Sequence, residues 1–250
     1  MVVASPFRSQ PSDLSDFVRI TLEDGLSHPT VWDIAQDKYG YMWFATQNGL
    51  NRYDGYQCTV YRLDQPDSLG VGNGIVRTCY ADSSGEIWVG TDDGLAYYNC
   101  DLDKFEYFSS WEGGEKMSVH GIAELDENEL LIFSNGKKLK IFDRKSLRFL
   151  VPENGLADIV SPSSVSSQGD EVYIGSDEGV YIYSISRKTL DFIPVKIEKN
   201  RRKLVFVRQR PDFLWIGTEG GGLIRYDFRT ERTKTYVHNP AVKGSISSNY

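Results

Sequence analysis

Residues 87–99 read IWVGTDDGLAYYN, and variants of this stretch occur four more times along the chain. They are MWFATQNGLNRYD at 42–54, LLIFSNG at 130–136, VYIGSDEGVYIY at 172–183 and LWIGTEGGGLIRYD at 214–227. The second residue recurs at spacings of 45, 43, 42 and 42 residues, at Trp43, Trp88, Leu131, Tyr173 and Trp215. A fixed period of this size indicates a repeat architecture, because a unit of about 40 residues cannot bury its apolar faces without neighbours.

The composition of each unit distinguishes between a four-stranded propeller blade and a pair of solenoid helices, both of which have repeats of about this length. Apolar residues fall in short runs rich in Val, Ile, Tyr, Trp and Phe, and Gly and Asp separate the runs. This pattern is typical of strands and hairpin turns, and no stretch is helical in period. In the second unit we expect strands at 75–81, 86–91, 95–99 and 104–108. The predicted fold is therefore an all-β propeller of four-stranded blades.

The ends of the chain do not match whole units. Residues 17–21 resemble an outer strand, and residues 245–250 resemble the link that leads into an inner strand. We therefore expect about five blades with partial ends, which is an incomplete or truncated ring. We expect residues 1–16 to be an N-terminal tail and residues 17–250 to be the propeller. The expected repeats are at about 23–63, 70–110, 117–151, 156–195 and 200–240.

Composition limits the classes of partner. The chain has 250 residues, a formal net charge of −7 and a pI near 5.1, which argue against a nucleic-acid surface. The one basic cluster, at 199–203, is expected to be a solvated loop or else a contact to an anionic ligand or partner. No run of about 20 apolar residues occurs that could span a membrane.

Few residues have a pattern that predicts catalysis or metal binding. The three histidines are scattered, and the acidic turns are spaced around the expected ring, so we predict no metal, no cofactor and no catalytic residue in this chain. Three cysteines cannot all pair with one another, and we expect each to be a small buried apolar residue. They are Cys58, Cys79 and Cys100.

Two units carry a longer shared pattern, Asp-x-x-Gly-x-(Ile or Met)-Trp followed by Thr-x-x-Gly-Leu, in residues 37–50 and 82–95. This pattern strongly resembles the two-component regulator propeller repeat, and residues 215–218 match part of it. The resemblance is fair in the fourth unit and poor in the third. It implies the periplasmic sensor region of a bacterial hybrid two-component histidine kinase, which recognises products of glycan breakdown.

The same resemblance implies further parts of the full-length protein. These are a second propeller, an immunoglobulin-like domain, a membrane helix and a histidine kinase with a DNA-binding regulator, or else a diguanylate cyclase. It also implies that the full-length protein is a homodimer. In this reading the present chain is not an enzyme. It binds an oligosaccharide or another small molecule, and the kinase lies elsewhere in the polypeptide.

A ligand is expected on the rim that carries the links between blades and the turns between second and third strands. The candidate residues there are His28, Thr30, Asn73, His120, Arg201 and Arg202. Aromatic residues that recur in every blade are expected to be core. This leaves Trp32, Tyr39 and Trp111 as candidates for stacking on a sugar.

Two other functions remain open at this stage. A protein-interaction scaffold would use a large rim surface and bind no small ligand. A secreted lyase or hydrolase would bring His, Arg, Tyr and carboxylates together near the central channel, and side chains on several blades can do this without a linear motif.

Overall fold

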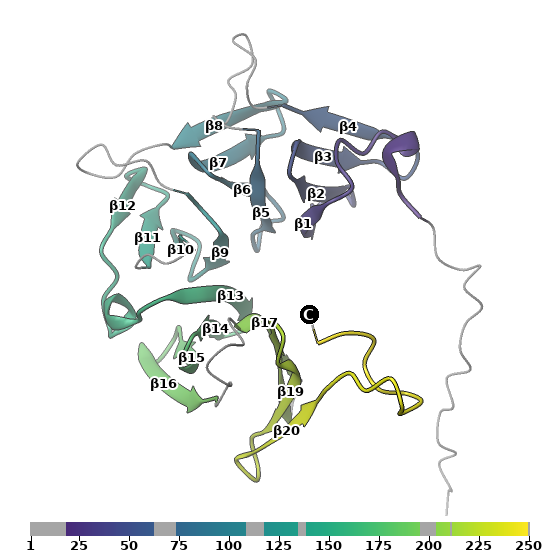
Figure 1. Ribbon diagram of the computed structural model, residues 1–250. Coiled ribbons are helices and arrows are strands. Elements are labelled where there is room, and N and C mark those ends of the chain that lie inside the picture. The colour runs from purple at the N-terminus through teal and green to yellow at the C-terminus, as the bar shows by residue number, and fades with distance from the viewer. Residues whose placement is uncertain are drawn as a thin grey trace, which may run out of the picture.

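The computed structural model describes residues 19–62, 74–108, 118–134, 139–195, 204–210 and 212–249, and of residues 204–210 it describes the backbone only. Within these residues the chain forms five antiparallel four-stranded sheets, in each of which neighbouring strands follow one another in sequence. Figure 1 shows the sheets side by side around a common centre, with the ring open between the first and the last. The predicted all-β propeller architecture is thus confirmed.

Each sheet is one blade, and its first strand is the innermost (Figure 1). Blade 1 is β1 Val31–Gln36, β2 Met42–Thr46, β3 Gly49–Tyr53 and β4 Cys58–Tyr61, and blade 2 is β5 Val76–Ala81, β6 Ile87–Thr91, β7 Gly94–Asn99 and β8 Lys104–Phe108. Blade 3 is β9 Gly121–Glu124, β10 Glu129–Phe133, β11 Lys140–Asp143 and β12 Arg148–Leu150. Blade 4 is β13 Pro162–Gln168, β14 Glu171–Ser176, β15 Gly179–Ser184 and β16 Thr189–Pro194, and blade 5 is β17 Leu204–Arg210, β18 Phe213–Thr218, β19 Gly222–Asp227 and β20 Arg232–Tyr236. The strands expected in the second unit agree with β5–β8 to within one residue at each end.

The segment expected to be an outer strand before blade 1 is not a strand where it is described. Residues 19–21 lead into a 3-10 turn, η2 Leu22–Asp24, and residues 17 and 18 lie outside the described part. The Thr21 hydroxyl accepts the N–H of Glu23, while the Asp24 carboxylate accepts the N–H of Thr21. This reciprocal cap uses polar groups that a strand would need for pairing, so it turns the chain at that point. A second 3-10 turn, η3 Leu156–Asp158, precedes blade 4.

The hydrophobic core lies between the blades. Within the described part of the chain there are four clusters of buried side chains, and each joins the second strands of two neighbouring blades. Trp43 packs against Ile87 and Val89, and Trp88 packs against Leu130 and Ile132. Side chains alternate along a strand. The tryptophan of a second strand therefore faces the next blade, and the two residues that flank it face the previous blade.

The recurring spacing between Asp and Trp in the first two units has a local physical cause. Asp37 lies six residues before Trp43 and accepts its indole N–H at 2.7 Å, and Asp82 does the same for Trp88 at 3.0 Å. The Asp37 carboxylate also accepts the backbone N–H groups of Tyr39 and Tyr41, and so closes the turn between the first and second strands. The Asp therefore forms the turn and also satisfies the polar atom of a buried indole.

The cysteines differ from one another in burial. All three are free thiols; Cys79 is buried as expected, whereas Cys58 and Cys100 are only half-buried. Cys58 is on an outer strand and Cys100 follows the end of β7, whereas Cys79 is on an inner strand. The expectation of a buried residue was wrong for these two.

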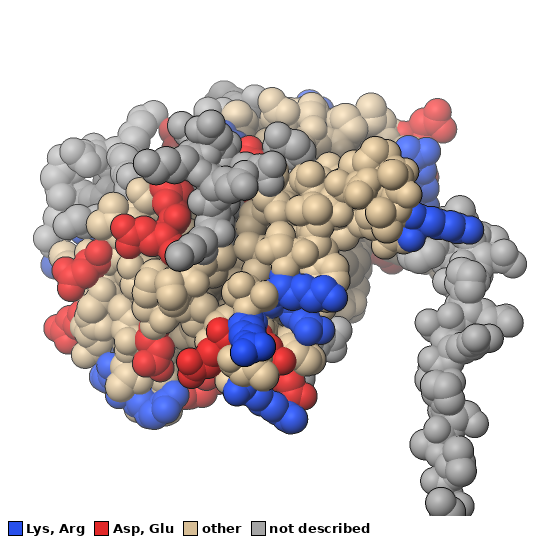
Figure 2. Space-filling view, turned by 60° about the horizontal axis from the view of Figure 1, so that its bottom comes forward, with Lys and Arg blue, Asp and Glu red and all other residues tan. Residues whose placement is uncertain are grey.

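Two properties of the surface bear on partners. Among the described residues, no helix is long and apolar enough to cross a membrane. Figure 2 shows the side of the molecule on which blades 4 and 5 lie, where acidic and basic side chains are interspersed beside a broad uncharged area. The described residues on this side therefore form no large patch of one sign that would attract a polyanion.

Candidate functional site

The inner strands of the first four blades line a central funnel of ≈ 890 Å³. Its walls come from β1, β5, β9 and β13, which are nearest to the centre in Figure 1. The volume lies within the range of about 300–1,000 Å³ that is typical of small-molecule sites. The funnel is therefore the candidate site.

A register shift near the start of the inner strands determines which side chains reach the funnel. The shift lies between Val31 and Asp33 in β1, and the same irregularity occurs in β5, β13 and β17. The residue inside each shift has no partner in register on the second strand, and such bulges redirect a side chain out of the sheet. These residues are Trp32, Arg77, Ser163 and Val205, of which the side chain of Val205 lies outside the described part.

His120 occupies the corresponding place in blade 3. Its backbone N–H donates to the carbonyl of Phe133, and Gly121 pairs with Phe133 at the register position where Asp33 pairs with Ala45 in blade 1. Trp32, Arg77, His120 and Ser163 all line the funnel. One position of the repeat thus presents a different functional group from each of four blades to one cavity, and we call these four residues the bulge ring.

Trp32 and Arg77 form one side of this ring. The Trp32 side chain is 50% exposed, and the Arg77 guanidinium lies 5.5 Å from the centre of its ring. Arg77 donates from Nε and Nη2 to the two oxygens of Asp92, at 2.8 and 2.9 Å. Hydrogen bonding to Arg77 holds the pKa of Asp92 below its usual value, so the pair is charged on both sides at neutral pH and holds the guanidinium against the indole.

Asp92 also connects Arg77 to the third member of the ring. The Ser118 hydroxyl lies 3.1 Å from Asp92 Oδ1 and 2.6 Å from His120 Nε2. Nε2 of His120 is itself 3.9 Å from Asp92 Oδ1. The hydrogen bonds therefore run Arg77–Asp92–Ser118–His120 along the rim and join blades 2 and 3.

The opposite wall of the funnel is rich in hydroxyl groups. β13 contributes Ser163, Ser164 and Ser166 to the lining, and Ser167 bonds to the Tyr80 hydroxyl at 3.2 Å. Within the described residues, the buried Ser164 Oγ has no hydrogen-bond partner. A wall of small hydroxyls can donate to or accept from a polar ligand without adding charge.

Asp33 lies deeper in the funnel, on the side of β1 that faces blade 2. Its carboxylate accepts the Thr78 hydroxyl at 2.6 Å and the backbone N–H of Cys79 at 3.2 Å. Burial raises the pKa of Asp33 despite these bonds and that from the N–H of Ile34. The carboxylate is fully engaged between two blades, so we assign it a structural role.

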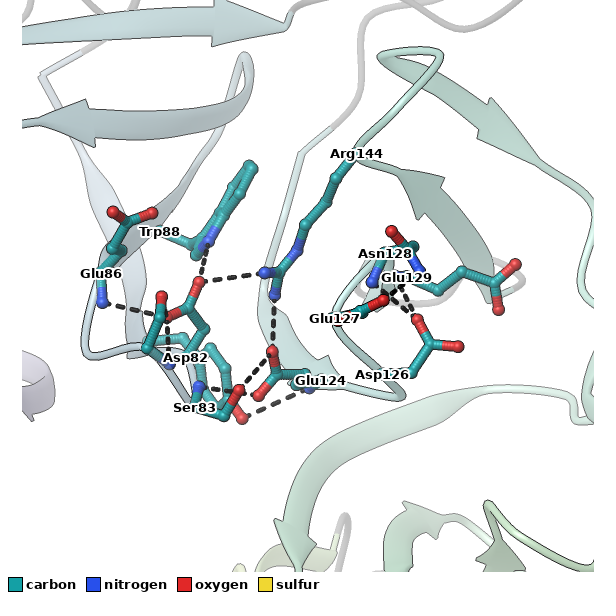
Figure 3. A network of polar contacts seen from close by, with 12 residues as sticks. Asp82, Ser83, Glu86, Trp88, Glu124, Asp126, Glu127, Asn128, Glu129 and Arg144 are labelled. Atoms are coloured by element: carbon teal, nitrogen blue, oxygen red, sulfur yellow. Dashed lines mark hydrogen bonds and ion pairs between the residues drawn. The ribbon is translucent and has the colours of Figure 1, made fainter.

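A second polar cluster lies at the opposite rim, beside a cavity of ≈ 420 Å³ (Figure 3). Arg144 bonds to Asp82 at 3.1 Å and to Glu124 at 3.0 Å, and its guanidinium lies 5.2 Å from the ring of Trp88. Glu124 also accepts the N–H and hydroxyl of Ser83. The carboxylates are satisfied by protein donors, and no metal-binding group of His, Cys, Asp and Glu occurs among the described residues. This cluster therefore links blades 2 and 3, and we call Asp82, Glu124 and Arg144 the latch.

The residues proposed from the sequence fall into three groups. His120 belongs to the bulge ring. His28 and Thr30 lie together in the link before β1, where His28 Nδ1 accepts the Thr30 N–H at 3.0 Å, and they are not part of the funnel lining. Asn73, Arg201 and Arg202 lie outside the described residues, as does Trp111.

Of the aromatic candidates, Trp32 lines the funnel and Tyr39 does not. Tyr39 is 62% exposed in the turn between β1 and β2, which is the opposite end of the inner strand from Trp32. Sequence reasoning did not find Arg77, Asp92, Ser118 or Ser163. A signal for Arg77 and Ser163 existed, because each bulge residue lies 13 or 14 positions before the Thr or Ser that ends the second strand.

Comparison with known families bears directly on the repeats. The model of the "Two component regulator propeller" family matches residues 25–48 and 70–93. Histidine kinase P4 of Formosa agariphila is 44% identical over 55 residues, which are 22% of this chain and 4% of that protein. Residues 25–48 and 70–93 are therefore similar to two-component regulator propeller repeats, and the chain spans a small fraction of the length of this relative.

Comparison of structures bears on the fold. The extracellular domain of the hybrid two component system BT3049 from Bacteroides thetaiotaomicron superposes with a TM-score of 0.61 at 20% identity, covering 93% of this chain and 38% of that one. PorZ, a surface component of the type-IX secretion system of Porphyromonas gingivalis, superposes with a TM-score of 0.61 at 15% identity, covering 88% of this chain and 35% of that one. These similarities establish the propeller fold. Because the two proteins differ in role, the fold alone does not decide the function.

Proposed function

We propose that this chain of two-component regulator propeller repeats is the ligand-sensing part of a periplasmic, hybrid two-component sensor, and that it binds an oligosaccharide at the mouth of the central funnel. The bulge ring is the observation that carries the proposal. Residues that only fill the core recur from blade to blade, as Trp43 and Trp88 do. The bulge position instead carries Trp, Arg, His and Ser, all of which line one cavity.

The chemistry of the ring suits an uncharged, polyhydroxylated ligand. The exposed face of Trp32 offers a flat apolar surface on which the C–H face of a sugar ring can stack. The paired charges of Arg77 and Asp92 and the β13 serines provide donors and acceptors for vicinal hydroxyls. Since the Arg77 charge is already compensated by Asp92, the rim does not favour an acidic ligand over a neutral one.

Binding at this place can be converted into a signal only if the ligand distinguishes between two arrangements of the receptor. We propose that the bound sugar projects from the funnel mouth toward a neighbouring domain and stabilises one relative orientation of the two. The coupling equals the difference in binding free energy between the two arrangements, so a ligand that touches only this propeller would not signal. The kinase output lies outside this chain.

The Ser118–His120 contact could also suggest a hydrolase, but the order of the groups does not favour one. In a serine hydrolase the carboxylate orients the histidine, which in turn deprotonates the serine. Here the Ser118 hydroxyl donates to Asp92, so the single serine proton is directed at a carboxylate and not at the histidine. The chain therefore lacks an activated nucleophile at this place.

The test is a thermal-shift screen of the protein against neutral and acidic oligosaccharides. A ligand at 100 times its Kd should stabilise the protein by about 2.7 kcal/mol, which raises the melting temperature measurably. We expect the shift to be lost in Trp32→Ala and strongly reduced in Arg77→Gln, because stacking and hydroxyl contacts disappear. Tyr39→Ala is the matched control, since it removes an exposed aromatic side chain that lies outside the funnel lining, in the turn between β1 and β2.

Each other outcome has a definite meaning. A shift of equal size in Trp32→Ala would place the ligand outside the bulge ring. No shift with any glycan, for a protein that melts cooperatively, would favour the interaction-scaffold function. Turnover of a glycan that is abolished by Ser118→Ala would establish the hydrolase instead.

A further inference from the structure

Two cavities of the molecule meet at one large side chain. The funnel of ≈ 890 Å³ and the cavity of ≈ 420 Å³ at the opposite rim, which we call the second cavity, share the lining residues Tyr80, Ala81 and Ser167. Alanine and serine are small, so Tyr80 is the bulky member of this shared set. The funnel and the second cavity are therefore neighbouring parts of one central space, and Tyr80 lies at the boundary between them.

The Tyr80 side chain connects three blades. Tyr80 is on the inner strand β5, and its hydroxyl lies 3.2 Å from Ser167 Oγ on the inner strand β13. The same hydroxyl accepts the backbone N–H of Glu124, on the inner strand β9, at 3.4 Å. Because β9 pairs with another strand on one edge only, its other edge is open toward the centre of the ring (Figure 1). The tyrosine thus reaches from blade 2 past the inner edge of blade 3 to blade 4.

This reach is a feature of blade 2 and not of the repeat. Tyr80 is the inner-strand residue that pairs with Trp88, the recurring residue of the second strand. The corresponding residues are Ala35, Ala123 and Ser166 in blades 1, 3 and 4, and Arg208 in blade 5, whose side chain lies outside the described part. Blades 1, 3 and 4 therefore carry side chains at this position that are too short to cross the space.

Tyr80 is also held in place. Its ring packs against the buried cluster between blades 2 and 3, which includes Trp88 and Ile122. Burial raises the pKa of Tyr80, so the hydroxyl keeps its proton at neutral pH and stays a neutral hydrogen-bonding group. Apolar packing at the ring and two hydrogen bonds at the hydroxyl fix the phenol between the two cavities.

We infer that Tyr80 is a specificity-determining residue that forms the floor of the funnel. Tyr80 lies three residues after Arg77 on β5, so the floor is roughly 10 Å further along the strand than the bulge ring. A ligand that enters at the mouth meets the phenol before it reaches the second cavity.

This inference rests on the proposed function and narrows its ligand class. A sugar chain that stacks on Trp32 and continues inward has to end above Tyr80. The ligand is then a short linear oligosaccharide bound by one chain end. An internal stretch of a polysaccharide does not fit, because its chain would have to continue past the floor.

The test compares glycans of different length in the unsubstituted protein and in two variants. The probes are malto-, cello-, xylo-, manno- and arabino-oligosaccharides from the disaccharide to the hexasaccharide, and isothermal titration calorimetry measures their affinity. Tyr80→Leu keeps an apolar side chain against the cluster but is too short to reach Ser167. Tyr80→Phe is the matched control, because it keeps the ring and loses only the hydroxyl.

We expect the affinity of the unsubstituted protein and of Tyr80→Phe to level off as the chain lengthens, since added units project from the mouth into solvent. In Tyr80→Leu the hexasaccharide should bind about tenfold more tightly than in the unsubstituted protein, because added units reach hydrogen-bonding groups of the second cavity. Hydroxyl-radical footprinting locates these units. The hexasaccharide should protect Ile185, which lines the second cavity, in Tyr80→Leu but not in the unsubstituted protein.

Two kinds of failure can be told apart. Binding of a glycan that protects Ile185 in the unsubstituted protein would leave the proposed function intact and overturn the floor, and this readout needs no variant. The same dependence on length in a cooperatively melting Tyr80→Leu would also overturn it. If no glycan binds to any of the three proteins, the proposed function is wrong, and the role of Tyr80 in ligand selection is wrong with it.

Discussion

At the scale of single residues, one hydrogen-bonded turn connects the second and third strands and recurs from blade to blade. The Thr91 hydroxyl donates to the carbonyl of Gly94 at 3.2 Å and accepts the N–H groups of Asp93 and Gly94. Glycine is required at the end of this turn for two reasons. Its φ is +155°, and a Cβ there would lie 2.5 Å from the carbonyl oxygen of Phe108 on the outer strand. The same close approach to the fourth strand recurs at Gly49, Gly179 and Gly222.

Gly94→Ala should therefore lower the free energy of unfolding by about 2 kcal/mol or more, because backbone strain and a backbone clash add. Gly169→Ala is a matched control: its φ is also positive, at +61°, but a Cβ there meets no atom within 4 Å. We expect this control to cost about 1 kcal/mol. Urea denaturation of both variants measures the difference. Equal losses would mean that the approach to the outer strand does not matter.

At the scale of elements, the blades are joined by polar contacts as well as by apolar cores. Arg144, which follows β11, reaches back to Asp82 in the turn between β5 and β6 and to Glu124 in β9 (Figure 3). In blade 1 the position across from Trp43 is Arg52, whereas the position across from Trp88 is Tyr97. The guanidinium beside Trp88 therefore comes from Arg144 of the next blade, whereas the guanidinium beside Trp43 comes from Arg52 of the same blade.

The latch predicts a pH dependence of stability. Burial alone would raise the pKa of Asp82, but bonds from Ser84, Glu86 and Trp88, together with Arg144, lower it below its ordinary value. An acid with a lowered folded-state pKa stabilises the fold above its unfolded pKa of about 3.9, and this stabilisation is lost as the pH falls through the folded value. Asp82→Asn should therefore cost about 2 kcal/mol at pH 7, and the difference in stability from the unsubstituted protein should shrink as the pH falls below about 3.9.

Asp33→Asn is the control, because the charge of Asp33 should change the stability of the fold with pH in the opposite direction from that of Asp82. Burial raises the pKa of Asp33, so its ionisation opposes folding as the pH rises from about 4 through the folded value. The unsubstituted protein should lose stability relative to this variant over that range. Thermal melts from pH 2 to pH 7 follow both variants. A constant cost of Asp82→Asn at all pH values would show that its charge does not stabilise the latch.

At the scale of the whole molecule, stability comes from interfaces between neighbours. Each of the four buried clusters joins two adjacent blades, so the energy of the arc is approximately a sum of blade and nearest-neighbour terms, as in other repeat proteins. A substitution should therefore have an effect that depends on how many neighbours its blade has.

The recurring tryptophans test this dependence. Trp43→Ala removes a fully buried side chain between blades 1 and 2 and should cost about 3–5 kcal/mol. Trp215→Ala, at the same position of the repeat, removes a half-buried side chain and should cost less than about 2 kcal/mol. Guanidinium denaturation of the two variants measures the ratio. Similar costs would show that another group covers Trp215 in solution.

Much of the fold could be predicted because the information is local and repeated. The strands of the second unit, the turn residues and the burial of Trp43 and Trp88 follow from hydrophobic alternation and from Gly and Asp at fixed spacing. The strand expected at 17–21 was wrong for its described part, because a local cap at Thr21 competes with pairing. For the candidate site, His120 and Trp32 were identified as candidates, but their position in the bulge ring was not.

The sequence by itself determined the blade, its strand order and the large apolar residue at the second position of each repeat, since all of these depend on contacts within one repeat or on the period. Only the tertiary structure decided which non-recurring side chains meet. Trp32, Arg77 and His120 are 43–45 residues apart in sequence, and they share one funnel because the blades curve around a centre and a bulge turns the same position of each inner strand toward it. The repeat period defines the position of these residues in each blade, but only the curvature of the ring brings them together around one cavity.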